Sequence, residues 1–148
     1  NKLPIENKLL LIIGGGSYLQ KRIFRNARNV KITGFIEDVV SYLQAMDIYV
    51  LPSLTETSSL STLEAMSAGL AVVATPVGAI SDYLFNRQNG VLFDVNDTDT
   101  LVKILMELYN DQELRSKLGK NARITASKFT WDRTIKDIKK VFDEELKN

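Results

Sequence analysis

Short, largely apolar runs that end in glycine, proline or another turn residue alternate in this sequence with apolar residues at helical spacing. The runs cover residues 9–13, 30–32, 48–51, 71–74 and 91–93. Apolar runs without a polar residue at every second position are typical of strands buried on both faces, as in a parallel sheet. Strands that alternate with helices form βαβ units. The sequence therefore predicts an α/β domain in which helices flank a parallel sheet.

Helical periodicity marks the segments between and after these strands. We expect helices from Ser17 to Phe24 and over residues 39–46, 61–68 and 80–85, with Gly69 ending the third. After the turn signal Asn89-Gly90 and a short edge strand, the pattern becomes purely helical. The last three helices are expected around residues 101–108, 114–124 and 131–146, with Gly119 as a weak point in the second.

Composition indicates one ordinary domain and excludes several kinds of chemistry. The 148 residues suit a single domain, and 45% of them are apolar. Cysteine and histidine are absent, which excludes disulfides, thiolate metal sites and histidine as a general base. A net charge of +1, with acids and bases mixed along the chain, argues against nucleic-acid binding. Because no apolar run nears the roughly 20 residues of a membrane span and no signal peptide is visible, we expect a cytoplasmic protein.

Ligands of a parallel sheet bind outside the carboxyl ends of its strands, which here are the loops at residues 14–17, 33–36, 52–61 and 75–81. In the first loop, Gly14-Gly15-Gly16-Ser17 lies between a strand and a helix, where backbone N–H groups can bind a phosphate. The dinucleotide fingerprint fails because Leu19 occupies the third glycine position, and no Gly-Lys-Ser/Thr ending supports a P-loop. The triple glycine is therefore either a ligand loop or a tight turn.

The third loop and the helix after it contain the most informative residues, Glu56 and Glu64. A hydroxyl-rich stretch, with Ser58, Ser59 and Ser61 as candidate N-caps, leads into the helix. Free N–H groups at the start of this helix would attract an anion. Two carboxylates would repel a phosphate, but they accept hydrogen bonds well from sugar hydroxyls. A phosphate group with a sugar at each end would use the whole segment, with one glutamate on each sugar.

Each glutamate also has a purely structural interpretation. Ser61-Thr62-Leu63-Glu64 fits a capping box, in which the carboxylate of Glu64 accepts a hydrogen bond from the N–H of Ser61. Glu56 fits a solvated acid in a loop. Spacing alone favours these interpretations over ligand binding.

The same segment resembles the signature of glycosyltransferase family 4, whose members are retaining enzymes with the GT-B fold. That signature has two glutamates with seven residues between them, then Ala-Met-x-Ala-Gly, which here are Glu56, Glu64 and Ala65-Met66-Ser67-Ala68-Gly69. No single motif is specific, but the resemblance covers nearly the whole chain. Further motifs in the family's order are Gly14-Gly15-Gly16-Ser17, Gly34-Phe35-Ile36, Asp47-Ile48-Tyr49-Val50-Leu51-Pro52-Ser53, Val77-Gly78-Ala79-Ile80-Ser81-Asp82, Asn89-Gly90-Val91-Leu92-Phe93 and Phe129-Thr130-Trp131.

The resemblance implies a Rossmann-like, nucleotide-sugar-binding C-terminal half of a two-domain enzyme. Glu56 would be the catalytic residue that contacts the transferred sugar, and Glu64 would hold the ribose. A hexose would pass from a UDP or GDP sugar to a glycan or lipid acceptor, as in polysaccharide biosynthesis, with no metal or other cofactor. The remaining donor-site residues that it implies are Gly14, Gly15 and Gly16 in the glycine loop, Ile36 beside the base, and Ser59, Leu60 and Ser61 at the diphosphate.

Several features depart from the family pattern. Thr57-Ser58-Ser59 stands where Gly-Phe-Gly is usual, and Asp82 stands where glutamate is usual. The family's donor domain begins with an earlier strand and helix that carry an Arg and a Lys for the diphosphate, and these, like the N-terminal acceptor domain, lie outside residues 1–148. We therefore expect one domain, a fragment that has no transferase activity alone and binds a nucleotide sugar weakly.

The implied partners are the nucleotide-sugar donor and the N-terminal domain, and peripheral association with a membrane-bound acceptor is left open. In the family the last helix crosses back to the N-terminal domain, so its apolar face would here be exposed or buried by self-association. Two other functions are left open: a non-catalytic nucleotide-sugar-binding module, and a sugar-nucleotide epimerase, against which the absence of histidine weighs.

Overall fold

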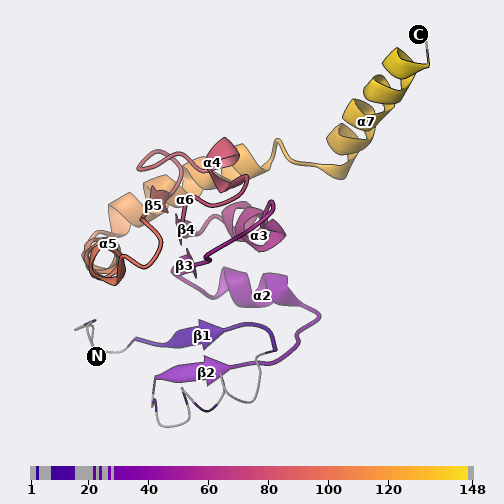
Figure 1. Cartoon of the computed structure of the whole chain (residues 1–148). Helices are drawn as coiled ribbons and strands as arrows, with labels where there is room; N and C mark the ends of the chain where they lie inside the picture. Colours follow the sequence, from indigo (N-terminus) through magenta and orange to yellow (C-terminus); the bar gives the residue numbers. More distant parts are fainter. Residues whose placement is uncertain are drawn as a thin grey trace.

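The structure, a computed structural model, describes residues 3, 8–15, 22, 24, 27 and 29–146. Gly16 and the start of the helix predicted from Ser17 lie outside the described residues. Each described element falls on a predicted strand or helix. In chain order they are β1 (Leu10–Ile12), β2 (Val30–Ile32), α2 (Val39–Gln44), β3 (Ile48–Leu51), α3 (Leu60–Ala68), β4 (Ala71–Ala74), α4 (Ile80–Tyr83), β5 (Val91–Leu92), α5 (Thr98–Asn110), α6 (Gln112–Ala126) and α7 (Trp131–Glu145), as drawn in Figure 1.

The strands of the described residues form two parallel sheets. β1 pairs with β2, with Leu10 opposite Val30. In the second sheet β4 lies between β3 and β5, with Val73 opposite both Val50 and Val91. The parallel pairing confirms the predicted α/β class, and β5 is the expected edge strand. Figure 1 shows the β1–β2 pair at one end of the molecule, beyond α2.

β4 is the centre of the core because helices cover both of its faces. All four of its residues are at most 1% exposed. Val72 and Ala74 belong to a buried cluster with residues of α3 and α6, whereas Ala71 and Val73 belong to a second cluster with residues of α5 and α6. A strand covered on both faces needs apolar side chains in both directions, which explains the uninterrupted apolar run.

α6 packs on α3 at Gly119, where the two backbones come into contact. A Cβ atom at Gly119 would lie only 2.0 Å from the carbonyl oxygen of Gly69, the residue that ends α3. The prediction that Gly119 is a weak point in its helix is wrong, because α6 runs unbroken through that position. Glycine is needed here since any side chain would separate the two helices.

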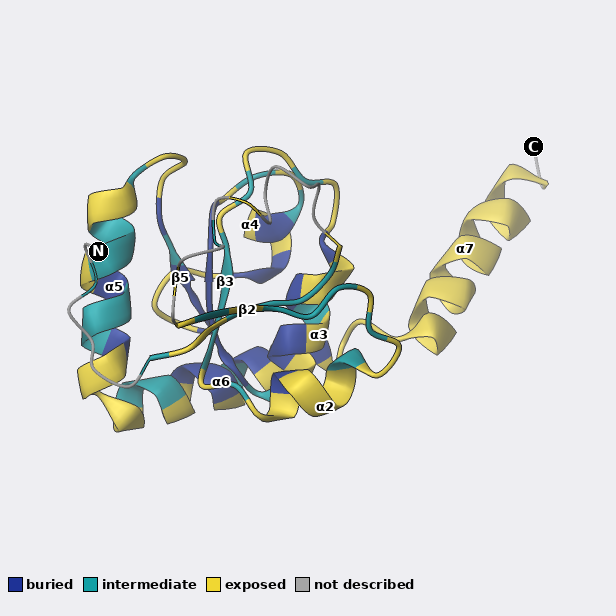
Figure 2. Cartoon of the chain, turned by 90° about the horizontal axis from the view of Figure 1, so that it is seen from below, coloured by how far each residue is buried: buried dark blue, intermediate teal, exposed yellow. Residues whose placement is uncertain are grey.

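α7 lies outside this core. None of its residues is buried, and Figure 2 shows the helix projecting away from the rest of the chain. Its apolar residues Trp131, Ile135, Ile138, Val141 and Phe142 are all at least half exposed. Of the two outcomes expected for this face, exposure is observed, and self-association stays a prediction. Among the described helices, none combines the length and the apolar character that a membrane span requires.

Candidate functional site

Two loops lie side by side at the carboxyl ends of β3 and β4, because these parallel strands are neighbours. The first is residues 52–59 and the second is residues 75–79. The hydroxyl of Thr75 donates a 2.6 Å hydrogen bond to the carbonyl oxygen of Ser53. Further along, the N–H of Ala79 donates a 2.8 Å bond to the carbonyl oxygen of Thr57. The second loop thus holds the first at both of its ends.

Glu56 projects from the first loop and is only partly buried. The hydroxyl of Ser53 donates a 2.7 Å hydrogen bond to its Oε1 atom. Its Oε2 atom has no hydrogen-bond partner among the described residues. An ionised carboxylate only accepts hydrogen bonds, so this second oxygen is available to a hydroxyl donor on a ligand.

The N-terminus of α3 presents unpaired backbone donors. The helix begins at Leu60, and its N-cap, Ser59, has φ 47° and ψ 80°, in the left-handed region. The Ser59 hydroxyl lies 2.9 Å from the hydroxyl of Thr62 and does not cap the helix. As a result, the N–H groups of Ser59, Leu60 and Ser61 donate to no acceptor in the described part of the chain. A helix start with free N–H groups is suited to an anion.

Glu64 lies on α3 and is exposed. The predicted capping box is wrong: with Ser59 as N-cap, Ser61 lies inside the helix and its hydroxyl accepts a 2.9 Å hydrogen bond from Tyr49. The Glu64 carboxylate makes no hydrogen bond or ion pair with the described residues. It is therefore free to bind a ligand beside the start of α3.

Tyr49 links the start of α3 to the charges of both glutamates. Burial is the main cause that raises the pKa of the Tyr49 hydroxyl, and the negative charges of Glu56 and Glu64 raise it further. Because the same hydroxyl donates to Ser61, the charges of both carboxylates act on a group that contacts the first turn of α3. We call Glu56, Glu64 and the N–H groups of residues 59–61 the α3 site.

The glycine loops after β1 and β2 form a second cluster. The N–H of Gly14 donates a 3.0 Å hydrogen bond to the carbonyl oxygen of Gly34. Apart from adjacent residues in the chain, no heavy atom of the described residues lies within 4 Å of the position that a Cβ atom would take at Gly14, Gly15 or Gly34, so this surface is open. Ile36 is partly exposed beside it. Among the described residues, no hydrogen bond joins this cluster to the α3 site.

The sequence assigned no role to two residues that contact the first loop, Gly78 and Tyr83. Gly78 has φ 59°, and a Cβ atom there would lie 2.3 Å from the carbonyl oxygen of Glu56. Tyr83, on α4, donates a 2.7 Å hydrogen bond to the carbonyl oxygen of Ser58. The glycine soon after Pro76 is a turn signal that could have pointed to Gly78. No local pattern marks Tyr83, because its partner is 25 residues away.

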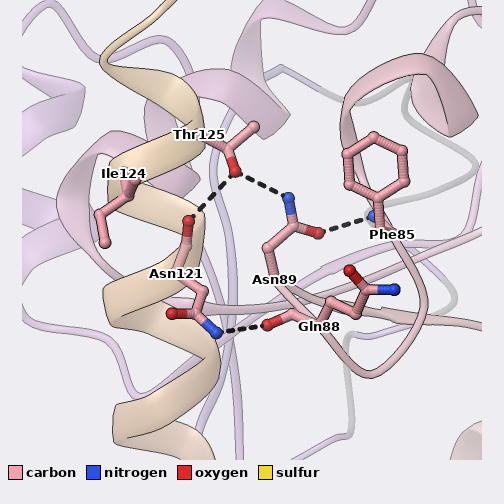
Figure 3. Close-up of a pocket in the computed structure, with 6 residues that line it drawn as sticks. All are labelled: Phe85, Gln88, Asn89, Asn121, Ile124 and Thr125. Carbon is pink, nitrogen blue, oxygen red and sulfur yellow. Dashed lines mark hydrogen bonds between the residues drawn. The ribbon is translucent and has the colours of Figure 1, made fainter.

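A pocket between the α4–β5 turn and α6 contains none of the predicted site residues (Figure 3). The amide of buried Asn89 bridges it, donating a 2.9 Å bond to Thr125 and accepting a 2.6 Å bond from the N–H of Phe85. No charged side chain lines the pocket, whose residues are Phe85, Gln88, Asn89, Asn121, Ile124 and Thr125. These contacts tie the turn to α6 and offer a phosphate no cation.

Comparison with known proteins identifies the family to which the chain is similar. The sequence model of the family described as "Glycosyl transferases group 1" matches residues 2–125. The uncharacterized glycosyltransferase MJ1178 of Methanocaldococcus jannaschii is 28% identical over 139 residues, which are 90% of this chain and 40% of that protein. The sulfoquinovosyl transferase SQD2 of Arabidopsis thaliana is 37% identical over 138 residues, 88% of this chain and 26% of that protein. The chain thus spans from a quarter to two fifths of the length of these relatives.

A solved structure shows the same fold. The Anabaena protein Alr3699/HepE, solved in complex with UDP, superposes with a TM-score of 0.86 at 22% identity, over 95% of this chain and 42% of that one. At this identity the likeness shows the fold alone. It confirms the predicted Rossmann-like α/β class.

Proposed function

Since this chain belongs to the family of group 1 glycosyl transferases, we propose that it is the donor-binding domain of a retaining GT-B enzyme of glycosyltransferase family 4. The full-length protein would transfer a hexose from a nucleoside-diphosphate sugar to a glycan or lipid acceptor. One observation carries this proposal: the unpaired N–H groups at the start of α3 accompany two carboxylates with unused oxygens, whose charges both act on Tyr49. Family membership also favours a transferase over an epimerase.

The donor's diphosphate binds at the N–H groups of residues 59–61. In exposed geometry the helix dipole contributes about 0.3–1 kcal/mol to holding an anion, and each N–H adds a charge-assisted hydrogen bond. When the bond between sugar and phosphate breaks, negative charge grows on the leaving diphosphate. Fixed N–H donors stabilise that charge most in the transition state, where it is largest. The proposal includes no metal ion or other cofactor.

The two glutamates bind the sugars on either side of the diphosphate. Glu64, one turn into α3, accepts hydrogen bonds from the ribose hydroxyls. Glu56 accepts from a hydroxyl of the transferred hexose through the oxygen that Ser53 leaves unpaired. Ser53 thus fixes the direction of the Glu56 carboxylate, and in this position Glu56 orients the reacting sugar. The glycine loop and the backbone near Ile36 take the nucleoside end.

The nucleotide and the partners follow from the same proposal. The UDP bound to HepE supports a uridine nucleotide, with a GDP sugar as the alternative. The acceptor binds to a part of the full-length protein outside residues 1–148. The exposed apolar face of α7 then contacts that part or a second copy of the chain.

Calorimetric titration of the full-length protein tests this proposal. The ligands are UDP, GDP and their hexose conjugates, and the variants are Glu56→Ala and Glu64→Ala, with exposed Glu113→Ala on α6 as the matched control. We expect Glu64→Ala to weaken the nucleotide and its sugar conjugate about tenfold or more, the loss of a hydrogen bond to a charged group. Glu56→Ala should weaken only the conjugate. Unchanged affinity and turnover in both variants would show that the roles are wrong.

A further inference from the structure

Tyr83 links α4 to the residues immediately before the donor-binding helix. Its side chain is 3% exposed, and its hydroxyl donates a 2.7 Å hydrogen bond to the carbonyl oxygen of Ser58. A second, longer contact of 3.5 Å reaches the carbonyl oxygen of Ser59. Neither the sequence pattern nor the proposed chemistry uses this buried hydroxyl.

Because of the geometry of the peptide unit, this hydrogen bond also fixes the direction of the N–H of Ser59. The peptide unit between Ser58 and Ser59 is planar and trans, so its C=O and N–H bonds point in opposite directions. Because the C=O of Ser58 points inward to Tyr83, the N–H of Ser59 points away from Tyr83. That N–H is one of the unpaired donors at the start of α3.

The backbone conformation of Ser59 is strained, which favours a change of this orientation. Its φ of 47° lies in the left-handed region, which residues with a Cβ atom adopt at a cost in energy. Rotation of the peptide unit between Ser58 and Ser59 would change this φ and would turn the N–H with it. The hydrogen bond from Tyr83 opposes that rotation.

Tyr83 is itself held firmly. Its ring meets the ring of Phe129 edge to face, with centroids 5.7 Å apart, and the amide of Asn89 donates a 2.8 Å hydrogen bond to its backbone carbonyl. Burial is the main cause that raises the pKa of Tyr83 to about 12. The hydroxyl therefore keeps its proton, and remains a donor, throughout the physiological pH range.

We propose that Tyr83 is a positioning residue of the donor site, which holds the carbonyl of Ser58 and thereby aims the N–H of Ser59 at the diphosphate. This inference rests on the proposed function, because it requires a diphosphate at the start of α3. Tyr83 touches neither the sugar nor the nucleoside. Loss of Tyr83 should therefore lower the affinity for a nucleoside diphosphate and leave the affinity for the nucleoside alone unchanged.

The test compares UDP with uridine, and GDP with guanosine, in titrations of the full-length protein. Tyr83→Phe keeps the ring that meets Phe129 and removes only the hydroxyl, and Tyr109→Phe on α5, a half-exposed tyrosine, is the matched control. We expect Tyr83→Phe to bind the diphosphate about tenfold more weakly, the loss of one hydrogen bond to a charged group. Its affinity for the nucleoside, and all affinities of the control, should stay at the wild-type values.

The outcomes distinguish failure of the positioning role of Tyr83 from failure of the proposed donor-binding function. If the wild type prefers the nucleoside diphosphate and Tyr83→Phe keeps the full preference, the positioning role is wrong while the donor site stands. If the wild type shows no preference for the diphosphate, the proposed function is wrong and the inference falls with it. Should Tyr83→Phe fail to fold, the alternative variant is Phe129→Ala. This change removes the half-exposed ring that packs against Tyr83 and so allows the Tyr83 ring to move. In that variant an unchanged preference overturns the positioning role.

Discussion

Replacing Gly78 by alanine tests whether the second loop supports Glu56. The added Cβ atom would lie 2.3 Å from the carbonyl oxygen of Glu56 and 2.6 Å from that of Thr57, whereas ordinary contacts begin near 3.4 Å. One of the loops must therefore move by about 1 Å, and such overpacking costs about 1–3 kcal/mol. The left-handed φ of 59° costs alanine about 1–2 kcal/mol more. Lower entropy of the unfolded chain returns about 0.4–1 kcal/mol, so we expect a net loss of about 2–4 kcal/mol in the free energy of unfolding.

Urea denaturation followed by circular dichroism measures this loss. The matched control is Gly15→Ala, because Gly15 has open space around it and no positive φ. The control should unfold at the wild-type urea concentration or slightly above it. Gly78→Ala should unfold at a clearly lower concentration and should also bind a nucleotide sugar more weakly, because Glu56 moves. The reasoning is refuted if the two variants unfold at the same urea concentration.

Three further predictions concern parts of the chain away from the loops. Gly119→Ala should lower the melting temperature although alanine favours helices, because its Cβ would lie 2.0 Å from the carbonyl oxygen of Gly69; a higher melting temperature would contradict the packing. The hydrogen bond from Arg87 is the main cause that lowers the pKa of Glu107, so the stability advantage of the wild type over Glu107→Gln should be complete above the ordinary value of 4.5 and disappear as the pH falls through the lowered pKa. An advantage that grows in acid would contradict this sign. Trp131, the only tryptophan, is 79% exposed, so its fluorescence maximum should barely change on unfolding; a large red shift would mean that α7 is covered.

The fold could be predicted from the sequence because buried strands have uninterrupted apolar runs. The run at residues 71–74 is apolar at every position, and the structure buries β4 on both faces. A helix end could also be predicted where a glycine follows the helix and takes a left-handed conformation, as Gly69 does after α3. Chain patterns of this kind depend only on neighbouring residues.

The details of the candidate site depend on contacts between distant residues, which the sequence could not reveal. The capping-box pattern at Ser61 and Glu64 was misleading because the N-cap of α3 is Ser59, two residues earlier than the pattern assumed. Gly119 was read as a helix weakness since its partner, Gly69, lies in another element. The hydrogen bond from Tyr83 to Ser58 was invisible for the same reason.

The departure at Thr57-Ser58-Ser59 has a structural counterpart. The resemblance to glycosyltransferase family 4 implies Gly-Phe-Gly here, with Ser59 in the place of the second glycine. Ser59 nevertheless has a positive φ of 47°. The loop thus keeps a glycine-like backbone conformation with a serine, and the contacts to Gly78 and Tyr83 help to hold it.

Amide chemical shifts test the central claim most directly. The claim is that a nucleoside diphosphate binds at the N–H groups that begin α3, and nuclear magnetic resonance detects even weak binding to the 148-residue chain. On titration of the ¹⁵N-labelled chain with UDP and with GDP, we predict that the largest shifts occur at Ser59, Leu60 and Ser61. Shifts confined to the pocket between Asn89 and Thr125, with residues 59–61 unchanged, would contradict the account.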